Sequence, residues 1–257
     1  MTDNAGVTEK RKTRAILIAS GKGGVGKSTA AIYLARALTQ AGRRVLLIDA
    51  DTGIGCLDAL LLGEPAETGW YEAAMEYCGW DAAVNTSPEG VDLLAAPKTA
   101  PDQEDGALIA SAIRRMRGAY DFILVDAPAG IDGAMTGCAS GCDNAIVVAT
   151  PDAVSVRGAR AAASALEKAG IAPEKIRLLI NRFVKKQAVR ARLLDIDGVI
   201  DRTGVRLLGI LPEDGRIPVS SVTGKLPKEG GAFRLACERV AKRIQGEQIP
   251  LSFRKMK

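Results

Sequence analysis

The sequence contains no histidine among its 257 residues, and only 4% of them are aromatic. Histidine is the commonest metal ligand and the commonest general base in proteins, so its absence excludes imidazole-based metal sites and catalytic triads. Chemistry on this chain must use carboxylates, amines, hydroxyls or a bound metal. No apolar run approaches the roughly 18–20 residues that a membrane-spanning helix needs, and the first residues show no apolar signal-peptide segment. We therefore expect a soluble, cytoplasmic protein.

The cysteines are few and odd in number, which argues against a disulfide framework and favours reduced thiols. They are Cys56, Cys78, Cys138, Cys142 and Cys237. Cys138 and Cys142 have C-x₃-C spacing, and no other cysteine forms a compact set with them. On a helix, residues four apart share a face, so we predict that this pair packs in the core. A metal role for it is the alternative.

The overall composition is that of an ordinary globular chain, with 47% hydrophobic and 25% charged residues. Disordered, collagen-like and coiled-coil classes are excluded. Lys and Arg together number 35 against 30 Asp and Glu, which gives a formal net charge of +5. This balance favours anionic ligands such as nucleotides, nucleic acid or acidic lipid without choosing among them.

Strand-like apolar runs alternate with helical patterns along the chain. The predicted strands are residues 15–19, 45–48, 91–95, 122–125, 145–149, 176–180 and 207–211, and the predicted helices are residues 28–40, 106–117, 153–169, 188–202 and 232–245. Continuous apolar runs are typical of strands buried on both faces. The alternation predicts an α/β fold with a mostly parallel, doubly wound sheet flanked by helices on both faces. We expect a basic leader at 1–13, one domain at 14–245 and a tail at 246–257.

A glycine-rich segment directly follows the first predicted strand and opens the first predicted helix. Gly21, four further residues and then Gly26-Lys27-Ser28 match the P-loop pattern in full. Glycines let backbone N–H groups surround phosphate oxygens, and the helix N-terminus adds partial positive charge. The pattern predicts that Lys27 reaches the β- and γ-phosphates and that the Ser28 hydroxyl binds Mg²⁺. The predicted phosphate-binding residues are Gly23, Gly24, Val25, Gly26, Lys27, Ser28 and Thr29.

Lys22 is a second lysine near the start of this loop, which an ordinary P-loop does not need. The run from Lys22 to Thr29 resembles the deviant Walker A motif of the MinD/ParA family, and the resemblance extends over residues 14–245. Membership implies a P-loop ATPase that binds ATP with Mg²⁺ and hydrolyses it slowly. It also implies an ATP-bridged homodimer, in which Lys22 reaches the partner's nucleotide.

Two predicted strands end in carboxylates, at the edge where open α/β sheets bind their ligands. The strand at 45–48 is followed by Asp49-Ala50-Asp51, and the strand at 122–125 is followed by Asp126. An apolar run ending in aspartate is typical of a Walker B acid that supports Mg²⁺. The family resemblance assigns water positioning to Asp51 and a place near the Mg²⁺ shell to Asp49. A pair of turn or cap aspartates is the alternative. The segment 52–63 resembles a MinD-type switch followed by a short helix.

The resemblance also suggests where the adenine base binds. Asn181 and Arg182 end a predicted strand, and Pro212 and Asp214 follow another. Asn181 is expected to hydrogen-bond the base edge, while Arg182 and the segment from Pro212 to Asp214 flank its faces. Strand-terminal polar residues in turns are the alternative.

The implied role is positional: ATP-dependent dimerisation acts as a switch that places a division, flagellar or cargo complex through a regulatory protein. Membrane attachment at the inner face is left open, because the tail contains Pro250 and its apolar residues alternate with period 2, unlike an amphipathic helix. A ParA-like DNA-binding role is one alternative, and a metal-cofactor maturation ATPase is another. Candidate DNA phosphate contacts are Arg114, Arg115, Arg117, Lys185, Lys186, Arg190 and Arg192.

Overall fold

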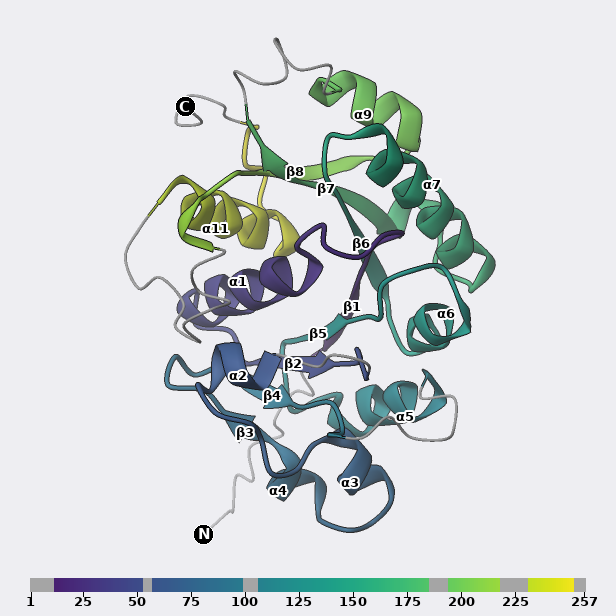
Figure 1. Ribbon diagram of the computed structural model, residues 1–257. Coiled ribbons are helices and arrows are strands. Elements are labelled where there is room, and N and C mark those ends of the chain that lie inside the picture. Colours follow the sequence, from purple (N-terminus) through teal and green to yellow (C-terminus); the bar gives the residue numbers. More distant parts are fainter. Residues whose placement is uncertain (1–11, 53–56, 99–105, 185–193, 218–230, 252–257) are drawn as a thin grey trace, which may run out of the picture.

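The computed structural model describes residues 12–52, 57–98, 106–184, 194–217 and 231–251. Within them an eight-stranded sheet has the order β3-β4-β2-β5-β1-β6-β7-β8, parallel except for the β3–β4 pair (Figure 1). The predicted fold class is confirmed. The strands are β1 Arg14–Ala19, β2 Val45–Asp49, β3 Asn85–Thr86, β4 Asp92–Leu94, β5 Phe122–Asp126, β6 Asn144–Ala149, β7 Ile176–Phe183 and β8 Leu207–Pro212.

Helices cover both faces of this sheet. Figure 1 shows α1, α11 and α2 on one face, α5, α6, α7 and α9 on the other, and α3 and α4 beside the β3–β4 edge. The α-helices are α1 Lys27–Gln40, α2 Leu57–Leu61, α3 Trp70–Ala74, α4 Trp80–Ala83, α5 Gly106–Met116, α6 Gly133–Ala139, α7 Ala153–Lys168, α9 Ile196–Thr203 and α11 Ala232–Ile244.

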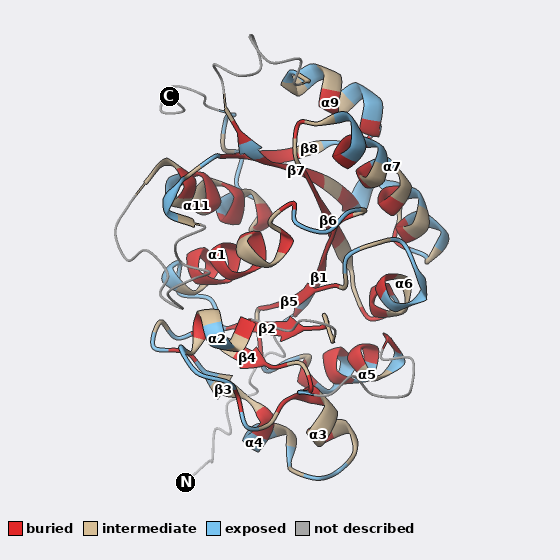
Figure 2. Cartoon of the chain, viewed as in Figure 1, coloured by how far each residue is buried: buried red, intermediate tan, exposed pale blue. Residues whose placement is uncertain are grey.

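The central strands are apolar along their whole length because both of their faces are covered. In β1, Ile16 and Ile18 join the core beneath α1 and α11, whereas Leu17 joins the core beneath α5 to α7. Successive side chains of a strand point to opposite faces, so one continuous apolar run supplies both cores. Figure 2 shows these strands buried between partly exposed helices.

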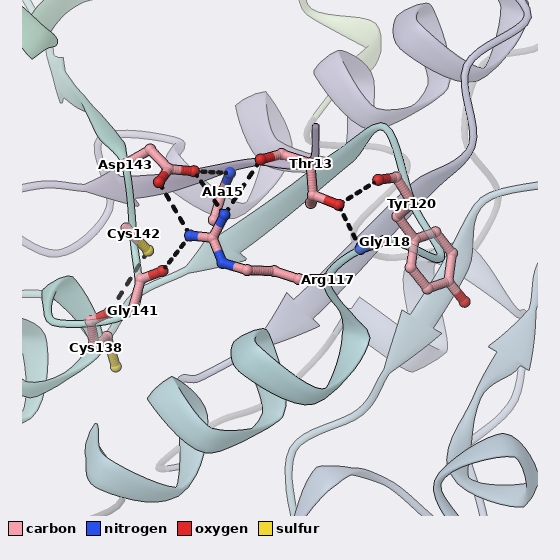
Figure 3. Close-up of polar contacts among 9 residues, drawn as sticks. All are labelled: Thr13, Ala15, Arg117, Gly118, Tyr120, Cys138, Gly141, Cys142 and Asp143. Carbon is pink, nitrogen blue, oxygen red and sulfur yellow. Dashed lines mark hydrogen bonds and ion pairs between the residues drawn. The ribbon is translucent and has the colours of Figure 1, made fainter. Parts of the chain in front are cut away.

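A polar clamp centred on Arg117 lies at the end of the sheet opposite the P-loop (Figure 3). The Arg117 guanidinium pairs with both carboxylate oxygens of Asp143, at 3.0 and 3.1 Å, and also donates to the carbonyls of Thr13 and Gly141. Asp143 in turn accepts the Ala15 N–H at 2.8 Å. Arg117 thus ties the start of β1 to the turn before β6. These contacts occupy a side chain that the sequence also offers as a DNA phosphate contact.

Two expectations about local structure are wrong. The helix predicted at 188–202 does not run through Leu194 and Asp195: α9 begins after Asp195, whose carboxylate caps it by accepting the Gly198 N–H at 2.8 Å. Residues 188–193 lie outside the described part. Cys142 does not share a helix with Cys138, because α6 ends at Ala139.

The core-packing prediction for this cysteine pair stands on the structure's own contacts. The Cys142 thiol donates to the Cys138 carbonyl at 3.5 Å, and both side chains pack against the same core. Among the described residues, no group of three or more His, Cys, Asp or Glu side chains is arranged to hold a metal ion. The described residues also include no helix that is both long and apolar enough to cross a bilayer.

Candidate nucleotide-binding site

The glycine-rich loop connects the end of β1 to the start of α1. Gly26 caps α1 in the left-handed backbone region, with φ of 87°, a conformation that costs a residue with a side chain much more than glycine. Val25 is buried beneath the loop, whereas Lys22, Gly23 and Gly24 are exposed. The exposed turn and the helix N-terminus together form the geometry that binds phosphate through backbone N–H groups.

Lys27, the first residue of α1, is held by a buried ion pair. Its ammonium group donates to Asp126 Oδ1 at 2.7 Å, and the side chains of Lys27 and Asp126 are only 6% and 1% exposed. Asp126 ends β5, next to β1 in the sheet, so the loop lysine and the strand-end acid meet at one edge. An ammonium group in this position is available to a phosphate that enters the loop.

Asp49 and Asp126 are direct neighbours at the ends of β2 and β5, which pair in register. Burial, together with the negative charge of Asp126, raises the pKa of Asp49 to about 7. Burial also raises the pKa of Asp126, although Lys27 opposes this effect. Asp126 Oδ2 is buried and has no hydrogen-bond partner among the described residues. Crowded carboxylate oxygens with an unused acceptor are suited to a hard cation, so these residues fit Mg²⁺.

Asp51 lies one residue beyond Ala50, at the mouth of the same edge. It is half-buried, and its N–H donates to Asp49 Oδ1 at 3.1 Å. Ser28 is half-buried in the first turn of α1, directly after Lys27. The structure therefore brings Lys27, Ser28 and the three aspartates to one edge of the sheet. Residues 53–56 of the resembling switch segment lie outside the described part, and α2 follows them.

A separate pocket lies beside the loop, between the ends of β7 and β8 and the start of α11. Its lining includes all four residues expected at the base. They are joined there by Gly26, Thr29, Glu213, Ile217 and Phe233. Asn181 is 3% exposed, and its amide donates to the Val25 carbonyl at 2.8 Å. The other amide atom, Oδ1, is buried without a partner in the described structure, so it is free to accept a hydrogen bond from a base amino group.

Lys22 lines a second pocket together with two other loop residues and residues from elsewhere in the chain: Gly24, Val25, Thr150, Pro151, Asp152 and Arg182. Burial raises the pKa of Asp152, but hydrogen bonds from Thr150 and Ser155 and the charge of Lys22 lower it below its usual value overall. Lys22 is thus exposed, with the Asp152 carboxylate close enough to feel its charge.

The sequence did not identify several residues that contact this site, Ile217 among them. Gly158 of α7 lies so close to Gly21 that a side chain on Gly21 would overlap the Gly158 backbone. Phe233 forms part of the base pocket, and its ring packs edge-on against Tyr33 of α1. Trp70 donates to the main chain of Asp49. The scarcity of aromatic residues could have drawn attention to Trp70; nothing local marked Gly158 or Phe233.

Comparison with known proteins gives consistent matches. The family described as CobQ/CobB/MinD/ParA nucleotide binding domain matches residues 16–227. The septum site-determining protein MinD of Synechocystis sp. is 32% identical over 244 residues, which are 92% of this chain and 91% of the relative. MinD of Bacillus subtilis is 32% identical over 247 residues, again 92% of this chain, and 91% of the relative.

Solved structures of MinD proteins share the fold, as two examples show. The MinC:MinD cell division protein complex of Aquifex aeolicus superposes with a TM-score of 0.83 and 29% identity, covering 93% of this chain and 98% of the other. MinD from Pyrococcus horikoshii, complexed with Mg-ADP, has a TM-score of 0.79 and 28% identity, covering 90% of this chain and 96% of the other.

Proposed function

The chain belongs to the CobQ/CobB/MinD/ParA nucleotide-binding family, and on that premise we propose that it is a MinD-like spatial regulator, which uses ATP binding and hydrolysis to control its own dimerisation. As an ATPase of this family it binds ATP with Mg²⁺ and converts it to ADP and phosphate. The observation that carries the proposal is the pair of lysines on one loop: Lys27 buried against Asp126, and Lys22 exposed away from it.

In this proposal each residue at the sheet edge has a distinct part in the reaction. Lys27 leaves Asp126 to bind the β- and γ-phosphates, while the loop from Gly23 to Thr29 surrounds them with N–H donors. Ser28, Asp49 and Asp126 would hold Mg²⁺, whose charge would offset that of the phosphates. Asp51, at the open mouth of the edge, orients the attacking water.

Base recognition in the proposal uses the pocket between β7, β8 and α11. The unpartnered Oδ1 of Asn181 accepts a hydrogen bond from the adenine amino group, and guanine has a carbonyl oxygen at the corresponding place. Arg182, Pro212 and Asp214 line the same pocket and would flank the faces of the base. The same residues therefore select ATP over GTP.

The proposed output is placement of the division site. Two ATP-bound copies associate face to face, with each Lys22 contacting the partner's nucleotide, and hydrolysis releases them. The dimer is cytoplasmic, associates peripherally with the inner face of the membrane and recruits a regulatory protein. This assignment is supported by the MinD relatives and by the MinC:MinD neighbour. We assign the ATPase domain to 14–245, with a leader at 1–13, whose last residue Thr13 is buried against Gly118 and Tyr120, and a tail at 246–257.

Sedimentation with two surfaces tests this output. Asp51→Ala protein, which should bind ATP without turnover, is mixed with acidic liposomes or with duplex DNA, in Mg-ATP or in Mg-ADP. We expect it to sediment with liposomes in ATP only. Binding to DNA in ATP only would assign the protein to the ParA-like alternative, with Arg114 and Arg115, exposed on α5, as first candidates for the contact. Equal behaviour with ATP and ADP would contradict a nucleotide switch.

A further inference from the structure

Trp70, the first residue of α3, makes a hydrogen bond that links this helix to the nucleotide-binding edge. Its side chain is fully buried, and the indole N–H donates to the main-chain carbonyl of Asp49 at 2.7 Å. Asp49 is 21 residues earlier in the chain. An indole buried at this depth normally needs an acceptor, and here the acceptor belongs to the end of β2.

The bond replaces a strand partner that the sheet lacks at this point. On the β5 side, the Ala50 N–H donates to the Asp126 carbonyl at 3.0 Å, so the Asp49 carbonyl points the other way, towards β4. β4, however, ends at Leu94, and the following Ala95 pairs with Gly69 instead. The Trp70 indole therefore satisfies a buried carbonyl that would otherwise lack a donor.

The indole is held rigidly. The main-chain N–H of Trp70 donates to the Ala95 carbonyl at 3.2 Å. Gly69 approaches Ala95 so closely that no side chain fits on Gly69. The Tyr71 ring packs edge-on against the indole, with centroids 6.0 Å apart. Glu72 fixes the entry to α3 by accepting the Gly69 N–H at 2.9 Å. A donor fixed in this way can define the position of its acceptor.

We propose that Trp70 is a positioning residue of the ATPase: its indole N–H holds the Asp49 carbonyl and thereby sets the turn that places Asp51. The same aspartate is held a second time, by the Asp51 N–H on its carboxylate at 3.1 Å. With the carbonyl and the carboxylate of Asp49 both hydrogen-bonded, the path of the main chain from β2 to Asp51 is constrained. The inference depends on the proposed water-positioning role of Asp51.

Trp70→Phe removes the N–H and keeps most of the apolar ring. We expect kcat for ATP to fall roughly tenfold, the factor that corresponds to one buried hydrogen bond needed in the transition state. KM for ATP should stay within about twofold, because Lys27 and the P-loop are untouched. Trp80→Phe is the matched control, since Trp80 is partly buried against the same core but belongs to α4, and this variant should keep both constants.

A second measurement needs no change at the site. The chain has two tryptophans, so Trp80→Phe protein gives one indole signal in a ¹H–¹⁵N spectrum. We expect that signal to exchange slowly with deuterium and to shift when Mg²⁺ and a non-hydrolysable ATP analogue bind, because the acceptor residue lies at the proposed metal site. A signal that ignores the nucleotide, or that exchanges like an exposed indole, would overturn the proposal.

Measuring Asp51→Ala in the same assay separates the positioning role of Trp70 from the water-positioning role of Asp51. Loss of turnover in Asp51→Ala with full turnover in Trp70→Phe would overturn the inference and leave the proposed mechanism intact. Full turnover in Asp51→Ala would remove the water-positioning role itself. A Trp70→Phe protein that loses ATP affinity and stability, with kcat unchanged at saturating ATP, would show that the indole is merely structural.

Discussion

Replacing Lys27 with methionine tests the buried ion pair at the centre of the site. The change keeps a long, unbranched side chain, one atom shorter, and removes its charge, so the Asp126 carboxylate, 1% exposed, loses the ammonium group 2.7 Å away. Breaking a buried pair by removing one partner costs about 3–5 kcal/mol, because the remaining charge is uncompensated. Asp49 adds repulsion from the neighbouring strand, so we expect the nucleotide-free protein to lose a free energy of unfolding in this range at about pH 8.

The loss should depend on pH in a definite direction. Burial already raises the pKa of Asp126, and without Lys27 it rises further. Folded Asp126 then binds a proton that the unfolded chain releases, so the unfolding free energy falls as pH rises. The deficit relative to wild type should therefore be smaller at about pH 5 than at about pH 8.

Urea unfolding followed by circular dichroism measures these differences. Lys27→Met with Asp126→Asn is the matched variant, because it removes the buried carboxylate as well. It should recover most of the stability, and the remaining deficit relative to wild type should no longer grow between about pH 5 and pH 8, yet the protein should still fail to bind ATP. The reasoning would be refuted by a Lys27→Met protein within about 1 kcal/mol of wild type at both pH values, or by a double variant no more stable than the single one.

Two further changes address neighbouring parts of the site. Gly26→Ala should lower the free energy of unfolding by about 1–2 kcal/mol, because Gly26 has a left-handed backbone. The added methyl group should also displace Asn181 and weaken ATP binding. Gly23→Ala is the control for thermal unfolding: no atom lies near the added methyl group, so this variant should melt like wild type. Asp49→Asn should flatten the fall in unfolding free energy between about pH 5 and pH 8, because the pKa of Asp49, raised to about 7, makes the nucleotide-free wild type less stable as pH rises. Denaturant unfolding at several pH values measures this dependence. If the unfolding free energy of Asp49→Asn falls with pH as steeply as that of wild type, Asp49 is not the titrating group.

Much of the site follows from local sequence. The spacing of Gly21, Gly26 and Lys27 after an apolar run places a phosphate loop between β1 and α1 whatever the rest of the chain does. Strands that end in Asp49 and Asp126 deliver carboxylates to the same edge once the sheet is parallel. For these residues, the neighbouring sequence and the pattern of apolar residues are enough to predict their place at the site.

Contacts across long sequence separations could not be predicted in the same way. Lys27 and Asp126 are 99 residues apart, and their pairing depends on the strand order β2-β5-β1, which no local pattern encodes. The helices α3 and α4 contain five and four residues, too few for a helical period to be recognised. Trp70 could therefore be noticed but not connected with Asp49.

The most direct test of the central claim is the mass of the protein in solution, measured by light scattering with Mg-ATP, Mg-ADP and no nucleotide. Asp51→Ala protein should be dimeric in ATP and monomeric otherwise. Adding Lys22→Ala should leave ATP bound, because Lys27 is intact, and should keep the protein monomeric. A double variant that still dimerises in ATP would contradict the role of Lys22, and a single variant that stays monomeric in ATP would contradict the switch.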